Sequence, residues 1–169
     1  ELAKLAKPDL ALITNVSNSH IKNFKNEKEI AVAKSEVFTG LSKNSVAIIN
    51  SDNKWHDLLV KKARNLNINI HLFGHSQQSD TKILKIINEK EGSTIFYDNI
   101  KNWHLKYLNS TQAMNAIATI SVIKELKLNL ETSLKIISNV KPLSGRGEKL
   151  TINFKGNNKT LIIDDSYNA

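Results

Sequence analysis

The sequence predicts an α/β fold: a mostly parallel sheet flanked by helices, a small antiparallel β insert, and the start of a second, Rossmann-like α/β domain. Three observations predict it. Short apolar runs alternate with helix-length amphipathic segments up to residue 73. Short strand-like segments separated by turn residues follow without helices between them. A break rich in glycine and proline then precedes two further strand-like segments.

The first part of the chain alternates strands and helices. Its predicted strands are continuous apolar runs, typical of strands buried on both faces, at residues 10–14, 46–49 and 68–73. Helices are predicted at residues 26–39 and 52–66. Gly40 follows the first helix and is expected to end it in the left-handed conformation.

The later part changes character. An antiparallel meander is predicted at residues 81–88, 93–97 and 103–108. Two helices follow at residues 111–126 and 130–139, and two strands at residues 149–154 and 160–163, joined by a Gly-Asn-Asn turn. The break at residues 142–147 sets the predicted boundary, which divides the chain into domains at 1–143 and 144–169.

Composition limits the classes of function. The 169 residues carry a net charge of +8, but the lysines are scattered and only two arginines occur, Arg64 and Arg146. Arginine is the usual reader of base edges, so a Lys/Asn-rich solvated surface is the favoured interpretation over nucleic-acid binding. The chain has no cysteine, which excludes disulfides and thiolate metal sites and agrees with a reducing cytoplasm. It has no 18-residue apolar run and no secretory pattern.

The last residues are the most informative segment. The apolar run 161–163 predicts a buried strand that delivers Asp164 and Asp165 to the edge of a sheet, where ligands of open α/β folds bind. Carboxylates in that position can accept hydrogen bonds from ribose hydroxyls. The alternative is that they cap a turn.

Lys34 has an unusual position. It lies four residues after Ile30 and three before Val37, which places it on the apolar stripe of its predicted helix. A buried ammonium is costly, so Lys34 must extend to solvent, pair with an acid, or lose its charge by a modification such as carbamylation. A carbamylated lysine would be an anionic group for a metal site.

Three further residues are candidates for a ligand site. His20 follows the first predicted strand and could bind a metal or a phosphate, or be an ordinary surface residue. Asn115 interrupts a helix in which asparagine is unfavourable, so it either faces a ligand or is solvent-exposed. Arg146, between two glycines, suits a phosphate clamp or a surface hinge. The chain has no Walker-type phosphate loop and no G-x-G-x-x-G motif.

Taken in order, several segments resemble a known family. They are Ile13-Thr14-Asn15-Val16 with His20 and Phe24, Ala33-Lys34-Ser35-Glu36-Val37-Phe38, Ile49-Asn50-Ser51-Asp52, Asn115-Ala116, Gly145-Arg146-Gly147-Glu148 and Asp164-Asp165-Ser166-Tyr167-Asn168-Ala169. Together they resemble the Mur ligases of peptidoglycan synthesis over nearly the whole chain. The final block is similar to that of the MurF type, which adds D-alanyl-D-alanine.

The resemblance implies an activity. ATP would phosphorylate the carboxylate of UDP-N-acetylmuramoyl-tripeptide, and the amine of D-Ala-D-Ala would attack the acyl phosphate. It implies ATP and Mg²⁺ as cofactors, His20 as a magnesium ligand, and Lys34 as a carbamylated lysine near a second metal. It implies contacts of Asn115 with adenine and of Arg146 with the phosphates. A monomeric cytoplasmic enzyme, without nucleic acid or membrane insertion, is expected.

The resemblance also assigns one of the pair Asp164/Asp165 to the ribose side, and leaves open which. The chain departs from the family pattern in several places. The family's phosphate loop and metal-binding glutamate lie upstream of Glu1, and most of its C-terminal domain lies beyond Ala169, so this piece alone is expected not to catalyse ligation. Where the family has a glycine-bearing loop, this chain has Ser17-Asn18-Ser19. Where the family has a Gly-x-His-Asn run, this chain has Asn109-Ser110-Thr111-Gln112.

Two alternatives stay open. One is another Mur-type or folylpolyglutamate-type ligase. The other is a non-catalytic basic binding module, which predicts cations clustered on one face and steep salt dependence. The ligase interpretation instead predicts that His20, Lys34 and Arg146 converge on one cleft.

Overall fold

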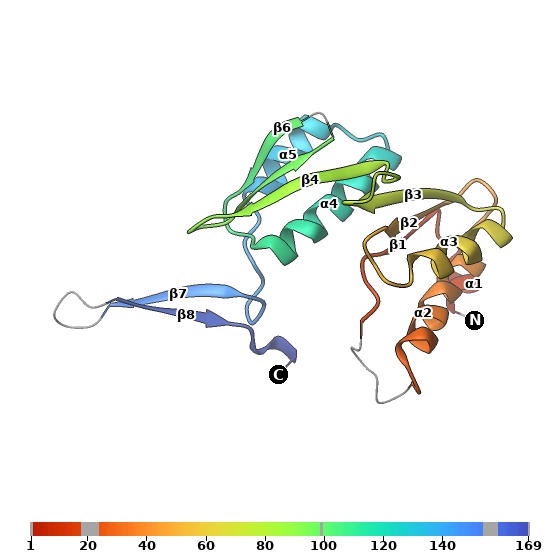
Figure 1. The fold of residues 1–169 in the computed structure, drawn as a ribbon, viewed down its shortest axis with the longest axis horizontal. Helices are drawn as coiled ribbons and strands as arrows, with labels where there is room; N and C mark the ends of the chain where they lie inside the picture. Colours follow the sequence, from red (N-terminus) through yellow and green to blue (C-terminus); the bar gives the residue numbers. More distant parts are fainter. Residues whose placement is uncertain (1, 18–23, 99, 154–158, 169) are drawn as a thin grey trace.

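The computed structural model describes residues 2–17, 24–98, 100–153 and 159–168. Its central feature is a six-stranded sheet with helices on both faces (Figure 1). In the described residues no helix is long and apolar enough to cross a membrane.

The sheet has the strand order β1-β2-β3-β4-β5-β6. Its strands are β1 (Leu10–Ile13), β2 (Val46–Asn50), β3 (Asn69–Gly74), β4 (Thr81–Asn88), β5 (Ser93–Tyr97) and β6 (Ile100–Leu105). Neighbours from β1 to β4 run parallel, and β4, β5 and β6 run antiparallel. The predicted fold class is confirmed, and the antiparallel meander extends the parallel sheet because β4 pairs with β3.

The described part of the chain has five α-helices and two 3-10 helices, and those that cover the six-stranded sheet divide between its two faces. They are α1 (Leu2–Ala6), α2 (Glu27–Ser35), the 3-10 helix η2 (Glu36–Gly40), α3 (His56–Asn65), α4 (Ser110–Glu125), α5 (Leu130–Ser138) and the 3-10 helix η3 (Ser166–Asn168). The side chains of α2 and α3 share a core with one face of β1 and β2, and those of α4 pack against the opposite face.

Adjacent residues of β2 show how the sheet separates two cores. Ile48 and Ile49 point to opposite faces because side chains alternate along a strand. Both are fully buried: Ile49 lies in the cluster with α2 and α3, and Ile48 in the cluster with α4. Burial on both faces is the physical reason for the continuous apolar run in β2, whereas Leu12 of the edge strand β1 is 36% exposed.

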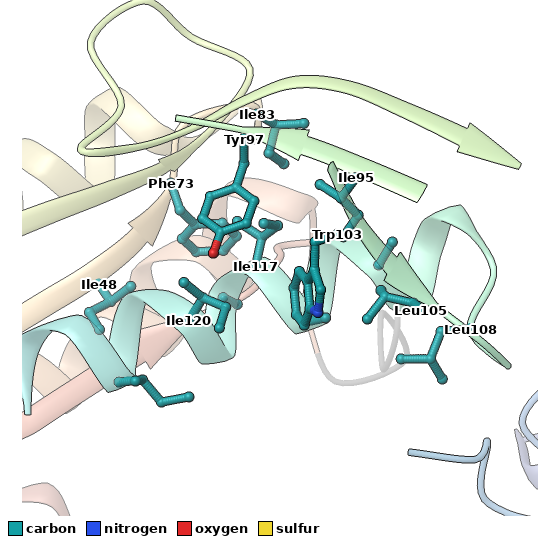
Figure 2. Close-up of a cluster of buried hydrophobic side chains, with 14 residues drawn as sticks. Ile48, Phe73, Ile83, Ile95, Tyr97, Trp103, Leu105, Leu108, Ile117 and Ile120 are labelled. Atoms are coloured by element: carbon teal, nitrogen blue, oxygen red, sulfur yellow. The ribbon is translucent and has the colours of Figure 1, made fainter. Parts of the chain in front are cut away.

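The second core joins α4 to the meander (Figure 2). The rings of Tyr97 and Trp103 meet edge to face with centroids 6.0 Å apart. Trp103 Nε1 donates to Ser138 Oγ over 2.8 Å, which attaches the end of α5 to β6. Ile117 and Ile120 of α4 pack beneath these rings.

The end of the second helix differs from the prediction. The α-helix stops at Ser35 and continues as a 3-10 helix to Gly40. Gly40 does not have a positive φ, so the expected left-handed stop is wrong. A Cβ at Gly40 would lie 2.0 Å from the carbonyl oxygen of Ala3, so the glycine is required by the close approach of the chain before β1.

The last strand also differs from the prediction. Strand β8 (Lys159–Asp164) pairs antiparallel with β7 (Glu148–Asn153) in a separate two-stranded sheet. Leu161, Ile162 and Ile163 are 56%, 40% and 60% exposed, so in the described structure the strand is not buried as expected. Both faces of a two-stranded sheet stay open to solvent unless another layer packs on them. The predicted turn at residues 156–158 lies outside the described residues.

The hydroxyl of Tyr97 gives a test of the second core. It is buried with no hydrogen-bond partner among the described residues, and burial, with a smaller contribution from Asp98, raises the pKa of Tyr97 to about 12. We expect Tyr97→Phe to leave the free energy of unfolding at pH 7 unchanged or to raise it by about 1 kcal/mol, because an unsatisfied polar group is removed. Urea denaturation measures this.

The same variant has a pH signature. An unfolded tyrosine ionises near pH 10 and the folded one only near pH 12, so ionisation favours the unfolded wild type as the pH rises above 10. Tyr97→Phe should remove this loss of stability, and the same change at the partly exposed Tyr107 should not. A large loss of stability at pH 7 would show that the hydroxyl is hydrogen-bonded in solution.

Candidate functional site

Two asparagines fix the chain where it leaves β1. Asn50 Nδ2 donates to the carbonyl oxygen of Thr14 over 2.9 Å, and Asn53 Nδ2 donates to that of Val16 over 3.1 Å. Both asparagines are 7% exposed. The segment that leads toward His20 is therefore held at the carboxyl edge of the parallel strands, where ligands of such sheets bind. His20 itself lies outside the described residues.

Lys34 is exposed, so its predicted place on the apolar stripe of the helix does not bury it. Its position on the helix lies between those of Ile30 and Ala31, but the buried residues of α2 are Ile30, Ala31 and Ser35. Lys34 lies in the last turn of α2, where its long side chain reaches solvent. Of the three alternatives for Lys34, extension into solvent agrees with the structure, and no burial forces a modification.

The turn before β7 gathers two of the predicted site residues. The backbone N–H of Gly147 donates to the carbonyl oxygen of Asp164 over 2.8 Å, and that of Tyr167 donates to Gly145 over 3.0 Å. The guanidinium of Arg146 lies 3.9 Å from the centroid of the Tyr167 ring. Arg146 and Asp164, 18 residues apart in the sequence, are thus held in one small unit.

The backbone conformation of this turn requires glycine at both positions. Gly145 has φ +72° and Gly147 has φ +77°, in the left-handed region that favours glycine. A Cβ at Gly145 would also lie 3.0 Å from the backbone nitrogen of Tyr167. The Gly-Arg-Gly sequence is therefore explained by the geometry of the turn.

The two neighbouring aspartates differ in surroundings. Asp164 is partly exposed, and its carboxylate accepts a hydrogen bond from the Ser166 backbone N–H at 3.1 Å. Hydrogen bonds from the Ser166 side chain, then from its backbone N–H, and a smaller one from Gly145 lower the pKa of Asp164. Asp165 is exposed. Asp164 thus closes a turn, the alternative that the sequence left open.

Helix α4 begins beside this turn. Asn109 and Gln112 form a reciprocal capping box, in which each side chain accepts from the other's backbone N–H. The Gln112 Nε2 donates to the carbonyl oxygen of Arg146 over 2.7 Å. Asn115 is exposed and lies three residues after Gln112 on the same helix. The Asn-x-x-Gln spacing is a readable capping signal that our sequence interpretation did not use.

The structure therefore brings together only part of the predicted site. Arg146, Asp164 and the capping box at the N-terminal end of α4 form one cluster, and Asn115 is exposed further along the same helix. Lys34 lies on α2, and no hydrogen bond or ion pair joins it to that cluster within the described ranges. In Figure 1, η3 lies at the end of the hairpin nearest to α2. The predicted convergence of His20, Lys34 and Arg146 stays a prediction.

Comparison with known proteins shows the protein family to which the chain belongs. Residues 1–123 match the family described as the Mur ligase middle domain. The match covers most of the chain, so the chain belongs to this family.

Individual relatives are similar to the chain over nearly its whole length. The chain is 31% identical, over 100% of its length, to a UDP-N-acetylmuramoyl-tripeptide–D-alanyl-D-alanine ligase of Rickettsia prowazekii, and 28% identical, over 99% of its length, to the ligase of the same name from Bacillus subtilis. It covers 37% and 35% of these two proteins. The chain therefore spans little more than a third of the relatives it matches.

Solved structures show the same fold. MurF from Acinetobacter baumannii superposes with a TM-score of 0.84 at 22% identity, over 99% of this chain and 36% of that protein. MurF from Thermotoga maritima in complex with ADP superposes with a TM-score of 0.78 at 24% identity, over 99% of this chain and 38% of that protein.

The surroundings of Asp164 give a second test. Ser166→Ala removes the side-chain hydrogen bond that contributes most to lowering the Asp164 pKa, so we expect that pKa to move up toward the ordinary value of 3.8. NMR titration of the side-chain carboxyl carbon measures it. The backbone hydrogen bonds remain, so the shift should be partial.

The dependence of the turn's stability on pH follows from thermodynamic linkage. A depressed folded pKa stabilises the turn at pH values above 3.8 and ceases to do so as the pH falls through the folded value. An unchanged Asp164 pKa in the variant would contradict the assigned cause.

Proposed function

We propose that the whole protein of which this chain is a part is an ATP-dependent amide ligase of the MurF type. It would add D-Ala-D-Ala to UDP-N-acetylmuramoyl-tripeptide in peptidoglycan synthesis. Family membership and the names of the relatives support the class of reaction. The observation that carries the proposal for this chain is the unit of Arg146 and Asp164 beside the N-terminal end of α4.

The division into domains is part of the proposal. Residues 1–143 would belong to the central ATP-binding domain, and residues 144–169 would begin the C-terminal domain. Two features support this: β7 and β8 form a sheet separate from the six-stranded sheet, and the glycine turn lies between the two sheets. A nucleotide at this turn would contact both domains.

Arg146 is suited to bind phosphate oxygens. Stacking on Tyr167 occupies one face of the guanidinium, and the N–H donors in its plane stay available for two parallel hydrogen bonds to a phosphate. In phosphoryl transfer, charge spreads over the transferred oxygens, and a fixed guanidinium stabilises it.

Asn115 and the aspartate pair would hold the nucleoside. The amide of Asn115 has both a donor and an acceptor, which a base edge such as adenine requires. The carboxylate of Asp164, which is partly exposed, can accept a hydrogen bond from a ribose hydroxyl. Asp165 is exposed and remains the other candidate for this contact.

The ligation step follows from the chemistry of the proposed substrates. The tripeptide carboxylate would attack the γ-phosphorus of ATP, ADP would leave, and an acyl phosphate would form. The amine of D-Ala-D-Ala would then attack the acyl carbon, with loss of inorganic phosphate and of one amine proton. Arg146 would stabilise the charge on the phosphate oxygens in the first step.

A Mg²⁺ site is not formed by the described residues alone. They contain no group of three or more His, Asp or Glu side chains placed to hold a metal, and Lys34 is exposed. Assigning His20 as a magnesium ligand and Lys34 as a carbamylated lysine therefore depends on the resemblance of their sequence blocks, and no step is derived through the metal. A monomeric cytoplasmic enzyme, with small-molecule substrates and no nucleic-acid partner, completes the proposal.

The test uses the full-length protein. Phosphate release that requires ATP, UDP-N-acetylmuramoyl-tripeptide and D-Ala-D-Ala together supports the function, and its absence in the unchanged protein overturns it. Arg146→Lys keeps the charge but loses the planar fork, so we expect kcat/KM for ATP to fall about tenfold or more. Arg64→Lys, on α3, is the matched control and should leave kcat/KM unchanged. Equal effects of the two variants would contradict the role of Arg146.

A further inference from the structure

Gln112 uses both ends of its side-chain amide. Its Oε1 accepts the backbone N–H of Asn109 at 3.0 Å, which closes the capping box of α4. Its Nε2 donates to the carbonyl oxygen of Arg146 at 2.7 Å, 34 residues further along the chain. The first bond satisfies the helix end. The second bond does nothing for the helix and connects it to the Gly145–Gly147 turn.

The turn has few other connections to α4. Its remaining backbone hydrogen bonds go to Leu143, Asp164 and Tyr167, which all lie within residues 143–167. Gly147 also packs close to the helix cap: a Cβ there would lie 3.6 Å from both Asn109 Nδ2 and Gln112 Nε2. The Gln112 amide is thus placed where the turn and the helix end meet.

We propose that Gln112 is a positioning residue that holds the Gly145–Gly147 turn, and with it Arg146, at the N-terminal end of α4. A glycine on each side gives this turn high conformational freedom, and a hydrogen bond to the carbonyl between them fixes the peptide from which Arg146 projects. Asn115 stands on the same helix. Gln112 therefore sets the spacing between a guanidinium donor and an amide that lie in separate parts of the chain.

A single variant separates the two bonds of Gln112. Gln112→Glu keeps the acceptor that caps Asn109, and glutamate at this helix position is itself favourable. It replaces the Nε2 donor with an oxygen that repels the carbonyl oxygen of Arg146. Gln112→Met has a similar shape and removes both bonds.

Hydrogen exchange of the full-length protein without nucleotide tests the connection directly. In Gln112→Glu the protected amides of Arg146, Gly147 and Tyr167 should exchange about fivefold faster or more, while those of α4 stay unchanged, since one hydrogen bond to the turn is lost. In Gln112→Met both sets should exchange faster. Gln78→Glu, an exposed site between β3 and β4, controls for the added charge and should change neither set. Unchanged exchange at Arg146 and Gly147 in Gln112→Glu overturns the proposal.

A second measurement tests whether the hydrogen bond from Gln112 to Arg146 contributes to the use of ATP, and this test rests on the proposed function. We expect Gln112→Glu to lower kcat/KM for ATP about fivefold, because a loosened Arg146 binds the phosphates less well and stabilises the charge developing on them less well. Faster exchange with an unchanged kcat/KM overturns the positioning role. A failure of the proposed function is distinguishable, because the unchanged protein would then show no substrate-dependent ATP turnover in which a KM could be measured.

Discussion

The packing of α4 across the whole sheet is the constraint on which the rest of the structure depends. Strands β3 and β4 pair through only two residue pairs, Phe73 with Thr81 and Gly74 with Lys82, so hydrogen bonding alone joins the parallel and antiparallel halves weakly. Helix α4 contacts every strand from β1 to β5. Its buried face is made of small and β-branched residues: Ala113, Ala116, Ile117, Ala118, Ile120, Ser121 and Ile123. Small residues let the helix approach both halves of the sheet closely, so that the parallel and antiparallel strands share one core on this face of the sheet.

The C-terminal end of α4 adds polar contacts at the same join. Glu125 Oε1 accepts a hydrogen bond from His71 Nδ1 at 2.6 Å, and His71 Nε2 is hydrogen-bonded to Thr81 Oγ1 at 2.9 Å. Lys124 Nζ donates to Thr81 Oγ1 at 3.2 Å and forms an ion pair with Asp98. The buried side chains of His71 and Thr81 thus each have polar partners, as a low-dielectric interior requires. The cluster fixes the register at a place where the strands contribute little.

The N-terminal end of α4 performs the corresponding task for the candidate site. Its capping box is completed by Gln112, and the same residue reaches the turn that carries Arg146. One helix thus connects the join of the sheet to the turn between the two sheets. The position of the turn depends on a helix whose own position is fixed by the core, so the buried cluster also restrains the exposed groups of the candidate site.

The sequence by itself determined the elements whose signals are local. Apolar runs predicted β1, β2 and β3, and the clearest of them, in β2, belongs to a strand that is buried on both faces and therefore needs consecutive apolar side chains. The blocks around Lys34 and the final aspartates indicated the family, and Gly-Arg-Gly marked the turn. The Asn109–Gln112 spacing was equally local and was readable as a capping box.

Only the tertiary structure decided the contacts between distant positions. The reason for Gly40 is the carbonyl of Ala3, the exposure of Lys34 depends on what lies beside the last turn of α2, and Gln112 meets Arg146 across 34 residues. Periodicity encodes which face of an element is apolar, but it contains no information on which other element comes to cover that face. That is decided by how α4 and the sheet pack together, and the candidate site depends on the same packing.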